Sequence, residues 1–274
     1  MGKRENQLQK PGTGHGGTLL ADNQSEKTER YRAPALDKGL DILELLSVQA
    51  GGMTRAEIVK AMDRSPSEIY RMLERLVARN YVARSLEGDR YALTTKLFVL
   101  GNRHPPVRRL ITQVQPLMDI FALEARQSCH LVIEDHGIAL VVAQAHCPAN
   151  WEFGVRAGAE IDLLGTGSGQ VLLAFQSMPA RELLISRWQG TDKIARLEQM
   201  EPQLSSYRKN GHRVGDSQQI RGIVDITVPI LSPRGFVIAV LTCPYMERLE
   251  EPGQPGIDQA LALLKDAANR LSLR

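Results

Sequence analysis

A glycine-rich segment, Gly165-Thr166-Gly167-Ser168-Gly169, lies directly before an apolar stretch with the composition of a helix. Free backbone amides at a helix N-terminus bind anions, so the segment predicts a site for a carboxylate or another anion. It lacks the lysine and spacing of a P-loop, and Thr166 departs from the G-x-S-x-G pattern of a nucleophilic serine. A tight turn without a ligand and a catalytic Ser168 are the alternatives.

A lone carboxylate, Asp225, lies within the apolar segment Ile223–Ile230, which we predict to be a strand. A buried carboxylate needs a partner, because its charge loses the stabilisation that water provides. The candidate partners are Arg156, Arg221 and His130, and a polar ligand is the alternative.

Two Cys–His pairs, Cys129-His130 and His146-Cys147, lie near the ends of the first predicted strand pair of the second half. Together they could supply a metal site, although their spacing has no CxxC element. Small polar residues buried in strands are the simpler alternative, and we predict neither a metal nor a cofactor. The chain has three cysteines, Cys129, Cys147 and Cys243, and no CxxC motif. This argues against a disulfide scaffold or a zinc ribbon.

Two short helices joined by a tight turn are predicted between residues 54 and 79. Thr54 with Glu57, and Ser65 with Glu68, have the three-residue spacing of capping boxes, which begin helices. The apolar residues of the second helix recur at helical spacing and predict one buried stripe, which comprises Ile69, Met72, Leu73, Leu76 and Val77.

The opposite face of this second helix carries serine, tyrosine and arginine near its start. Such a pair is typical of a helix-turn-helix whose second helix enters the DNA major groove, where arginine pairs with guanine edges. The side chains that we expect to contact DNA are Ser65, Ser67, Tyr70, Arg71 and Arg75. An ordinary helix pair with a solvated charged face is the alternative.

A predicted hairpin, Tyr81–Arg84 and Arg90–Leu93, follows these helices. With a preceding helix at Ala35–Val48 it completes the pattern of a winged helix. Arg84 and Arg90 flank the wing tip and are expected to contact phosphate or the minor groove, with plain solubility as the alternative. The first helix is expected to bury a stripe of leucines, which comprises Leu36, Leu40, Leu43 and Leu45 or Leu46.

The second half predicts an α+β domain with a mainly antiparallel sheet. A long helix is expected at Val107–Arg126, after the boundary at Pro105-Pro106. The expected strands are Ser128–Glu134, Ile138–Gln144, Trp151–Val155, Glu160–Leu163, Ile223–Ile230 and Phe236–Cys243. The expected helices are Gly167–Phe175, Ala180–Trp188, Ala195–Asn210 and Ile257–Leu271.

The 274 residues have room for two domains, and the 43% apolar content suits globular cores. We predict a disordered tail at 1–32, a winged helix-turn-helix at 33–94, a linker helix at 95–106 and an effector-binding and oligomerisation domain at 107–274. The net charge of +3 shows that the chain as a whole is not a polycation. Residues 64–103, however, contain eight basic and four acidic residues, which is a local excess of positive charge. No apolar run spans a bilayer and no signal sequence is evident, so we expect a cytoplasmic protein without a membrane partner.

From Pro34 to the C-terminus the sequence resembles the IclR-type transcriptional regulators. The resemblance is carried by ALDKGLDILELL, by Arg71-Met72-Leu73 and by three later motifs, which are GSGQVLLAF, NGHRV with GIVDITVPI, and GFVIAVLTCP. It implies a homodimer or homotetramer on a palindromic operator, with a GAF-like C-terminal domain that binds a small organic molecule, often a carboxylic acid. The implied effector-binding residues are Phe153, Gly167, Ser168, Asp225 and Thr242.

This chain departs from the family pattern at several of these positions. Asp225 stands where other members have a small residue such as cysteine, Gly215 replaces a usual acidic residue, and Pro244 replaces a serine. The effector is therefore expected to differ from those of the best-known members.

The favoured hypothesis is a regulator, not an enzyme, whose partners are double-stranded operator DNA and a small organic acid effector. One alternative is an enzymatic or ligand-binding C-terminal domain that uses the winged helix for protein docking. Another is a ligand sensor that acts through a protein partner.

Overall fold

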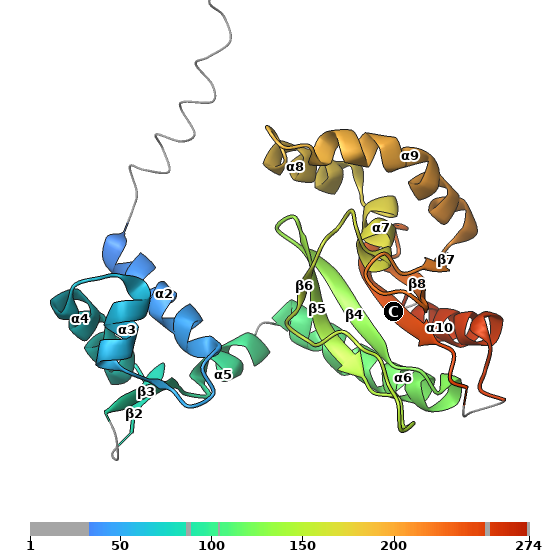
Figure 1. The fold of residues 1–274 in the computed structure, drawn as a ribbon. Coiled ribbons are helices and arrows are strands. Elements are labelled where there is room, and N and C mark those ends of the chain that lie inside the picture. The colour runs from blue at the N-terminus through green and yellow to red at the C-terminus, as the bar shows by residue number, and fades with distance from the viewer. Residues whose placement is uncertain (1–32, 86–88, 104, 250–252, 273–274) are drawn as a thin grey trace, which may run out of the picture. The chain divides into compact units, whose positions relative to one another are not determined.

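The computed structural model describes residues 33–85, 89–103, 105–249 and 253–272. The chain forms two compact units, residues 1–101 and residues 102–274 (Figure 1). The predicted tail at 1–32 and the tip of the predicted wing at 86–88 lie outside the described residues.

The described part of the first unit contains three helices packed around one core and a small sheet, and it ends in the linker helix α5 (Lys96–Asn102). Its elements are α2 (Pro34–Ser47), β1 (Met53–Thr54), α3 (Arg55–Met62), α4 (Pro66–Ala78), β2 (Val82–Arg84) and β3 (Arg90–Leu93). The strands are antiparallel in the order β1-β3-β2, and β1 is an addition to the predicted hairpin. The predicted helix-turn-helix and wing strands are thus confirmed. The short β1 escaped prediction because two residues carry no periodicity.

Local capping explains where α3 and α4 begin. The Thr54 amide donates to the Glu57 carboxylate at 2.8 Å, and the Thr54 hydroxyl accepts from the Glu57 amide at 3.3 Å. Ser65 and Glu68 form the second capping box, in which the Ser65 amide lies 3.4 Å from the Glu68 carboxylate. Between the helices Asp63 adopts a left-handed conformation with φ of 50°, which ends α3 and turns the chain.

The predicted leucine stripe of α2 is partly wrong. Leu36 and Leu40 are 61% and 47% exposed, whereas Ile42 and Leu46 are buried in the core of the unit. The two exposed leucines line an open groove beside α4. Helical spacing predicts which residues share a face but not how far a neighbouring helix covers that face.

The second unit is built on one six-stranded antiparallel sheet in the order β6-β5-β4-β9-β8-β7. The strands are β4 (Cys129–Asp135), β5 (Ile138–Ala145), β6 (Glu160–Ile161), β7 (Arg213–Asp216), β8 (Ile223–Leu231) and β9 (Val237–Met246). The helices are α6 (Pro105–Ala125), α7 (Gly167–Ala174), α8 (Met178–Arg187), α9 (Lys193–Asn210) and α10 (Ile257–Ser272). The linker helix α5 (Lys96–Asn102) precedes them. The predicted α+β class with an antiparallel sheet is confirmed.

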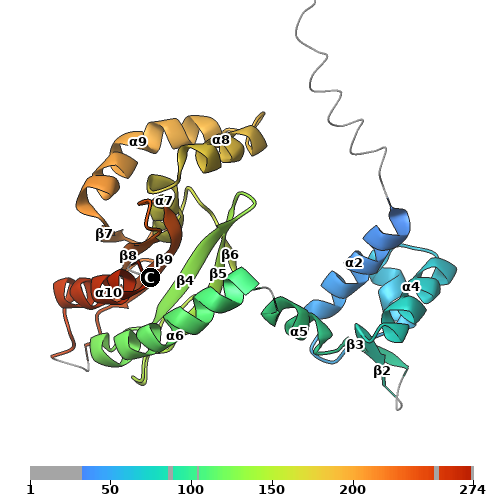
Figure 2. The same cartoon turned by 180° about the vertical axis from the view of Figure 1, so that it is seen from behind.

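Helices cover both faces of this sheet. Figures 1 and 2 show α6 and α10 on one face and α7, α8 and α9 on the other, and each layer encloses its own apolar core. Successive strand residues point to opposite faces. Cys129 and Leu131 of β4 therefore join the core under α6 and α10, whereas Val132 joins the core under α7.

Two predicted strands differ from the structure. Residues 151–155 form no strand, and Glu160–Leu163 is reduced to the two residues of β6. The first segment instead turns Phe153 and Val155 toward a cavity beside α7. In contrast, β7 was not predicted, because this polar edge strand lacks an alternating apolar pattern. None of the described helices is long and apolar enough to cross a membrane.

Candidate DNA-binding surface and effector pocket

The N-terminal half of α4 presents a polar, cationic surface. All five predicted side chains are exposed, which are Ser65, Ser67, Tyr70, Arg71 and Arg75. Neither arginine pairs with any residue that the structure describes. Their i, i+4 spacing places them one above the other on the same helix face. The Ser65 hydroxyl is occupied, because it donates to the Glu68 carboxylate at 2.9 Å.

Glu68 ties α4 to α2 through an ion pair with Lys38. The hydrogen bond from Lys38 and the bond from the Ser65 hydroxyl lower the pKa of Glu68 to about 2. The carboxylate is therefore charged at neutral pH and fixes the start of α4 against α2.

Arg55, the first residue of α3, belongs to the same surface and was not predicted. Its guanidinium lies over the Tyr70 ring, 5.5 Å from the ring centroid. A cation at this distance is attracted to the aromatic face. The capping box at Thr54 predicts where α3 starts, but it does not predict that its first side chain reaches α4.

The two predicted wing arginines are placed differently, because both have intramolecular partners. Arg84 forms an ion pair with Asp89 at 2.5 Å and lies over the Tyr91 ring at 5.9 Å. Arg90 donates to the carbonyl of Gly52 at 2.9 Å and lies 3.6 Å from the Glu57 carboxylate. Arg90 therefore holds the wing against the start of α3.

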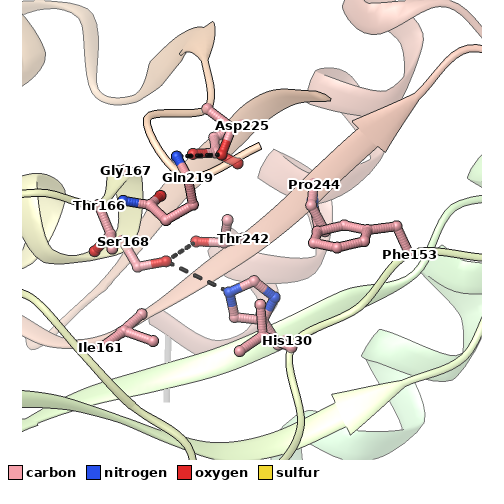
Figure 3. A pocket seen from close by; sticks show the side chains of 12 residues that line it. His130, Phe153, Ile161, Thr166, Gly167, Ser168, Gln219, Asp225, Thr242 and Pro244 are labelled. Atoms are coloured by element: carbon pink, nitrogen blue, oxygen red, sulfur yellow. Dashed lines mark hydrogen bonds between the residues drawn. The ribbon is translucent and has the colours of Figure 1, made fainter. Parts of the chain in front are cut away.

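In the second unit a cavity of about 70 Å³ lies between α7 and the sheet (Figure 3). Its lining includes all five residues that the resemblance implied, which are Phe153, Gly167, Ser168, Asp225 and Thr242. The other lining residues are His130, Val155, Ile161, Thr166, Ser217, Gln219 and Pro244. His130 stood out in the sequence as a possible metal ligand or carboxylate partner, but not as part of this wall.

Polar contacts connect α7 to strands β4, β8 and β9. The Ser168 hydroxyl lies 2.8 Å from that of Thr242, which donates to the Thr227 hydroxyl at 3.2 Å. Ser168 also lies 3.5 Å from His130 Nε2, and the His130 Nδ1 atom is buried without a partner among the described residues. Burial lowers the pKa of His130 to about 4, so the ring is neutral at pH 7.

Asp225 pairs with Arg213, at 3.8 Å between Oδ2 and Nη1, and both side chains are buried. The predicted partners Arg156, Arg221 and His130 are therefore wrong. Arg213 lies on β7, which pairs with β8 so that Gly215 faces Asp225, and the missed strand hid this contact. Burial raises the pKa of Asp225, while the Arg213 charge and a hydrogen bond from Ser217 oppose that rise.

The glycine-rich segment forms a tightly packed start of α7. The Thr166 hydroxyl accepts from the Gly169 amide at 3.1 Å and caps the helix. A Cβ atom on Gly169 would lie 2.3 Å from the Leu163 carbonyl oxygen, so this position requires glycine. Asp225 pairs with Arg213, and no described carboxylate contacts His130, so the described residues give Ser168 no Asp–His–Ser arrangement.

The two Cys–His pairs do not converge. Cys129 packs beside Met118 under α6, whereas His130 faces α7. His146 pairs with Glu152 at 2.9 Å on the surface, and Cys147 is buried. No group of three or more His, Cys, Asp or Glu side chains is placed to hold a metal ion within the described ranges.

Known proteins resemble both units. Residues 107–273 match the model described as "Bacterial transcriptional regulator IclR C-terminal", and residues 35–85 match the IclR helix-turn-helix domain. The regulator KdgR of Dickeya chrysanthemi is 27% identical over 90% of this chain and 85% of its own length. The repressor AllR of Salmonella typhimurium is 22% identical over 80% of this chain and 82% of its own length.

Solved structures share the fold. An IclR homologue from Microbacterium hydrocarbonoxydans complexed with 4-hydroxybenzoate has a TM-score of 0.70 at 21% identity, covering 87% of this chain and 98% of its own. The IclR of Thermotoga maritima has a TM-score of 0.65 at 21% identity, covering 87% and 97%. With its helix-turn-helix unit and its antiparallel-sheet unit both matched, the chain belongs to the IclR family of bacterial transcriptional regulators.

Proposed function

We propose that this regulator binds double-stranded operator DNA through the exposed face of α4, with Arg71 and Arg75 as its main cationic contacts. The observation that carries the proposal is that both arginines are exposed and have no partner among the described residues. A helix-turn-helix places the N-terminal residues of its second helix at base edges. Ser67, Tyr70 and Arg55 flank the two arginines on this surface, and the wing adds backbone contacts through Arg84 and Arg90.

The operator is palindromic and the protein acts as a homodimer or homotetramer in this proposal. A single helix-turn-helix reads one half-site, so two copies are needed to read a palindrome. Exposed apolar side chains on α6, Ile120 and Leu123, support an association between copies, because they are 44% and 66% exposed. Because the proposed operator DNA lies in the cytoplasm, this protein is cytoplasmic in the proposal.

A small organic molecule in the cavity beside α7 is the proposed effector. Its binding changes the geometry between copies and hence the spacing of the two recognition helices. The resemblance implies a carboxylic acid, and the homologue complexed with 4-hydroxybenzoate is a precedent for a hydroxylated aromatic acid. Because that homologue is only 21% identical, the chemical class depends on the residues that line this cavity.

Fluorescence anisotropy tests the proposal directly. The full chain is titrated into duplex DNA from the region upstream of its own gene, and into a scrambled duplex, across a salt series. We expect a preference for the upstream DNA, and a logarithm of affinity that falls linearly with the logarithm of salt concentration. Equal and weak binding to both duplexes would favour a winged helix used for protein docking.

A further inference from the structure

The cavity beside α7 contains a carboxylate and no available cation. Among its described lining residues there is one acidic side chain, Asp225, and neither lysine nor arginine. The nearest cation is Arg213, but each of its nitrogen atoms already has a partner. Nε donates to Gln170 at 3.1 Å, Nη1 to the Gly215 carbonyl at 3.4 Å, and Nη2 to the Asp216 carbonyl at 3.1 Å. A ligand carboxylate would therefore meet no lysine or arginine among the described lining residues, and the nearby Arg213 already compensates Asp225.

The first turn of α7 already lies beside a carboxylate of the protein itself. A Cβ atom built on Gly167 would lie 3.1 Å from the Asp225 carboxylate and 2.8 Å from Nη1 of Arg213, so this ion pair lies against the first turn of the helix. A helix N-terminus favours negative charge, and the Asp225 carboxylate is the acidic group closest to it among the cavity residues. A second carboxylate in a cavity of about 70 Å³ would lie close to a like charge.

The hydroxyl network assigns the tautomer of His130. The Thr242 hydroxyl donates to Thr227, so it accepts from Ser168. Each hydroxyl has a single hydrogen, so Ser168 has none left for His130. The hydrogen between them must therefore lie on His130 Nε2, which leaves Nδ1 as an acceptor.

This Nδ1 atom needs a donor that the described residues do not supply. It is buried and has no partner, and a buried acceptor without a hydrogen bond destabilises the protein. Figure 3 shows the second ring nitrogen of His130 turned away from Ser168, on the side of Phe153 and Pro244. Phe153 and Pro244 also line the cavity, so a ligand donor that enters on this side of the ring would satisfy Nδ1.

We propose that the cavity binds a small neutral or cationic molecule with at least two hydrogen-bond donors, a diol or an amino alcohol, and discriminates against carboxylates. One donor reaches the Asp225 carboxylate and the other reaches His130 Nδ1, while Phe153, Ile161 and Pro244 contact the carbon skeleton. The inference rests on the proposed function, in which this cavity holds the effector, and it replaces the organic acid implied by the resemblance.

Calorimetry with three probes of one carbon skeleton tests the proposal. Propane-1,2-diol, 1-aminopropan-2-ol and lactate share three carbons and differ only at the first, which is a CH2OH group, a CH2NH3+ group or the carboxylate carbon. We expect the full chain to bind the diol and the amino alcohol at least about tenfold more tightly than lactate, the ratio expected for one hydrogen bond to a charged group. Asp225→Asn should reduce this ratio, whereas the exposed control Asp266→Asn should leave it unchanged.

The preference of the unmodified protein decides the question even if Asp225→Asn does not fold. Lactate binding as tightly as the diol, or no binding by any of the three probes, would overturn the proposal. Operator binding is measured on the same preparation by anisotropy. If it persists in either case, the effector class is wrong while the regulator assignment stands. If operator binding fails while the diol binds, the proposed DNA contacts are wrong instead.

Discussion

The exposed face of α4 and the cavity beside α7 handle charge in opposite ways. On α4, Arg71 and Arg75 have no partner among the described residues, and they lose little by this because water solvates them. In the cavity, the buried Asp225 is compensated by Arg213, which is itself held by Gln170 and two carbonyls. A buried charge without compensation is strongly destabilising, whereas an exposed one is not.

This difference separates the two roles of the molecule. Free cations on a surface attract a polyanion without contributing to folding, so changes there should alter DNA binding and leave stability intact. The groups around the cavity contact one another, so substitutions there should lower the free energy of unfolding more than they change DNA binding. Substitutions at four places in the molecule test this separation, from the largest expected effect to the smallest.

Gly169→Ala should destabilise the second unit most. The new methyl group would lie 2.3 to 2.6 Å from backbone atoms of Leu163, which cannot rotate away. We expect a loss of about 3 kcal/mol or more in unfolding free energy, at the upper end for overpacking. Thermal and urea unfolding measure it. Gly101→Ala is the matched control, since nothing lies within 4 Å of its new methyl group, and it should be neutral or slightly stabilising. Equal stability of the two variants would show that the start of α7 is not tightly packed.

His130 should make the stability depend on pH. Burial lowers its pKa to about 4, whereas in the unfolded chain it is near 6.5. Between these values the unfolded chain binds more protons, so the stability is full above about pH 6.5 and falls as the pH drops toward 4. A shift of this size corresponds to a loss of up to about 3 kcal/mol in the free energy of unfolding.

Urea unfolding at a series of pH values should show this loss in the unmodified protein and a smaller one in His130→Gln. The control His212→Gln, on a partly exposed residue outside the cavity, should keep the full loss. A His130→Gln profile identical to the unmodified one would remove His130 as its source.

Arg71→Ala combined with Arg75→Ala should weaken operator binding without lowering stability. Losing two base or phosphate contacts should reduce affinity about a hundredfold, and the salt dependence should become shallower by about one unit for each lost phosphate contact. Anisotropy measures both, and the melting temperature should stay within about 1 °C, since exposed unpaired side chains contribute little to stability. The control is Arg187→Ala, an exposed arginine of α8 in the second unit. Normal operator binding by the double variant would mean that α4 is not the recognition helix.

Local signals in the sequence predicted much of this architecture. The capping boxes at Thr54 and Ser65 predicted where α3 and α4 begin, and helical spacing predicted the buried side of α4, where Ile69 and Leu73 are fully buried. Nearly continuous apolar segments predicted β8 and β9 to within a few residues. The family resemblance also indicated which residues lie together, because all five that it implied line the cavity.

Contacts between segments far apart in the chain could not be predicted from local sequence patterns. Arg213 and Asp225 meet because β7 pairs with β8, and a four-residue polar edge strand gives no pattern from which that register follows. The exposure of Leu36 depends on how far α4 reaches along α2. His130 was visible as a titratable residue, but its role follows only from the face of β4 on which it lies.

The smallest expected effect concerns the wing. Arg84 is exposed like Arg71, but it pairs with Asp89 and lies over the Tyr91 ring. Its charge is therefore compensated, as that of Asp225 is in the cavity. Arg84→Ala should lower operator affinity by less than about 1 kcal/mol and change stability by less than about 0.5 kcal/mol, as for a surface ion pair.

Asp89→Asn is the complementary change at the wing. Asparagine tolerates the positive φ of 53° at this position, and the substitution releases Arg84 from its ion pair. It should raise operator affinity slightly, and Arg84→Ala in the same background should abolish that gain. If Arg84→Ala alone weakens binding as much as the double change on α4, intramolecular pairing is no guide to which arginines contact DNA. Compensation would then separate buried charges from exposed ones, but not one exposed arginine from another.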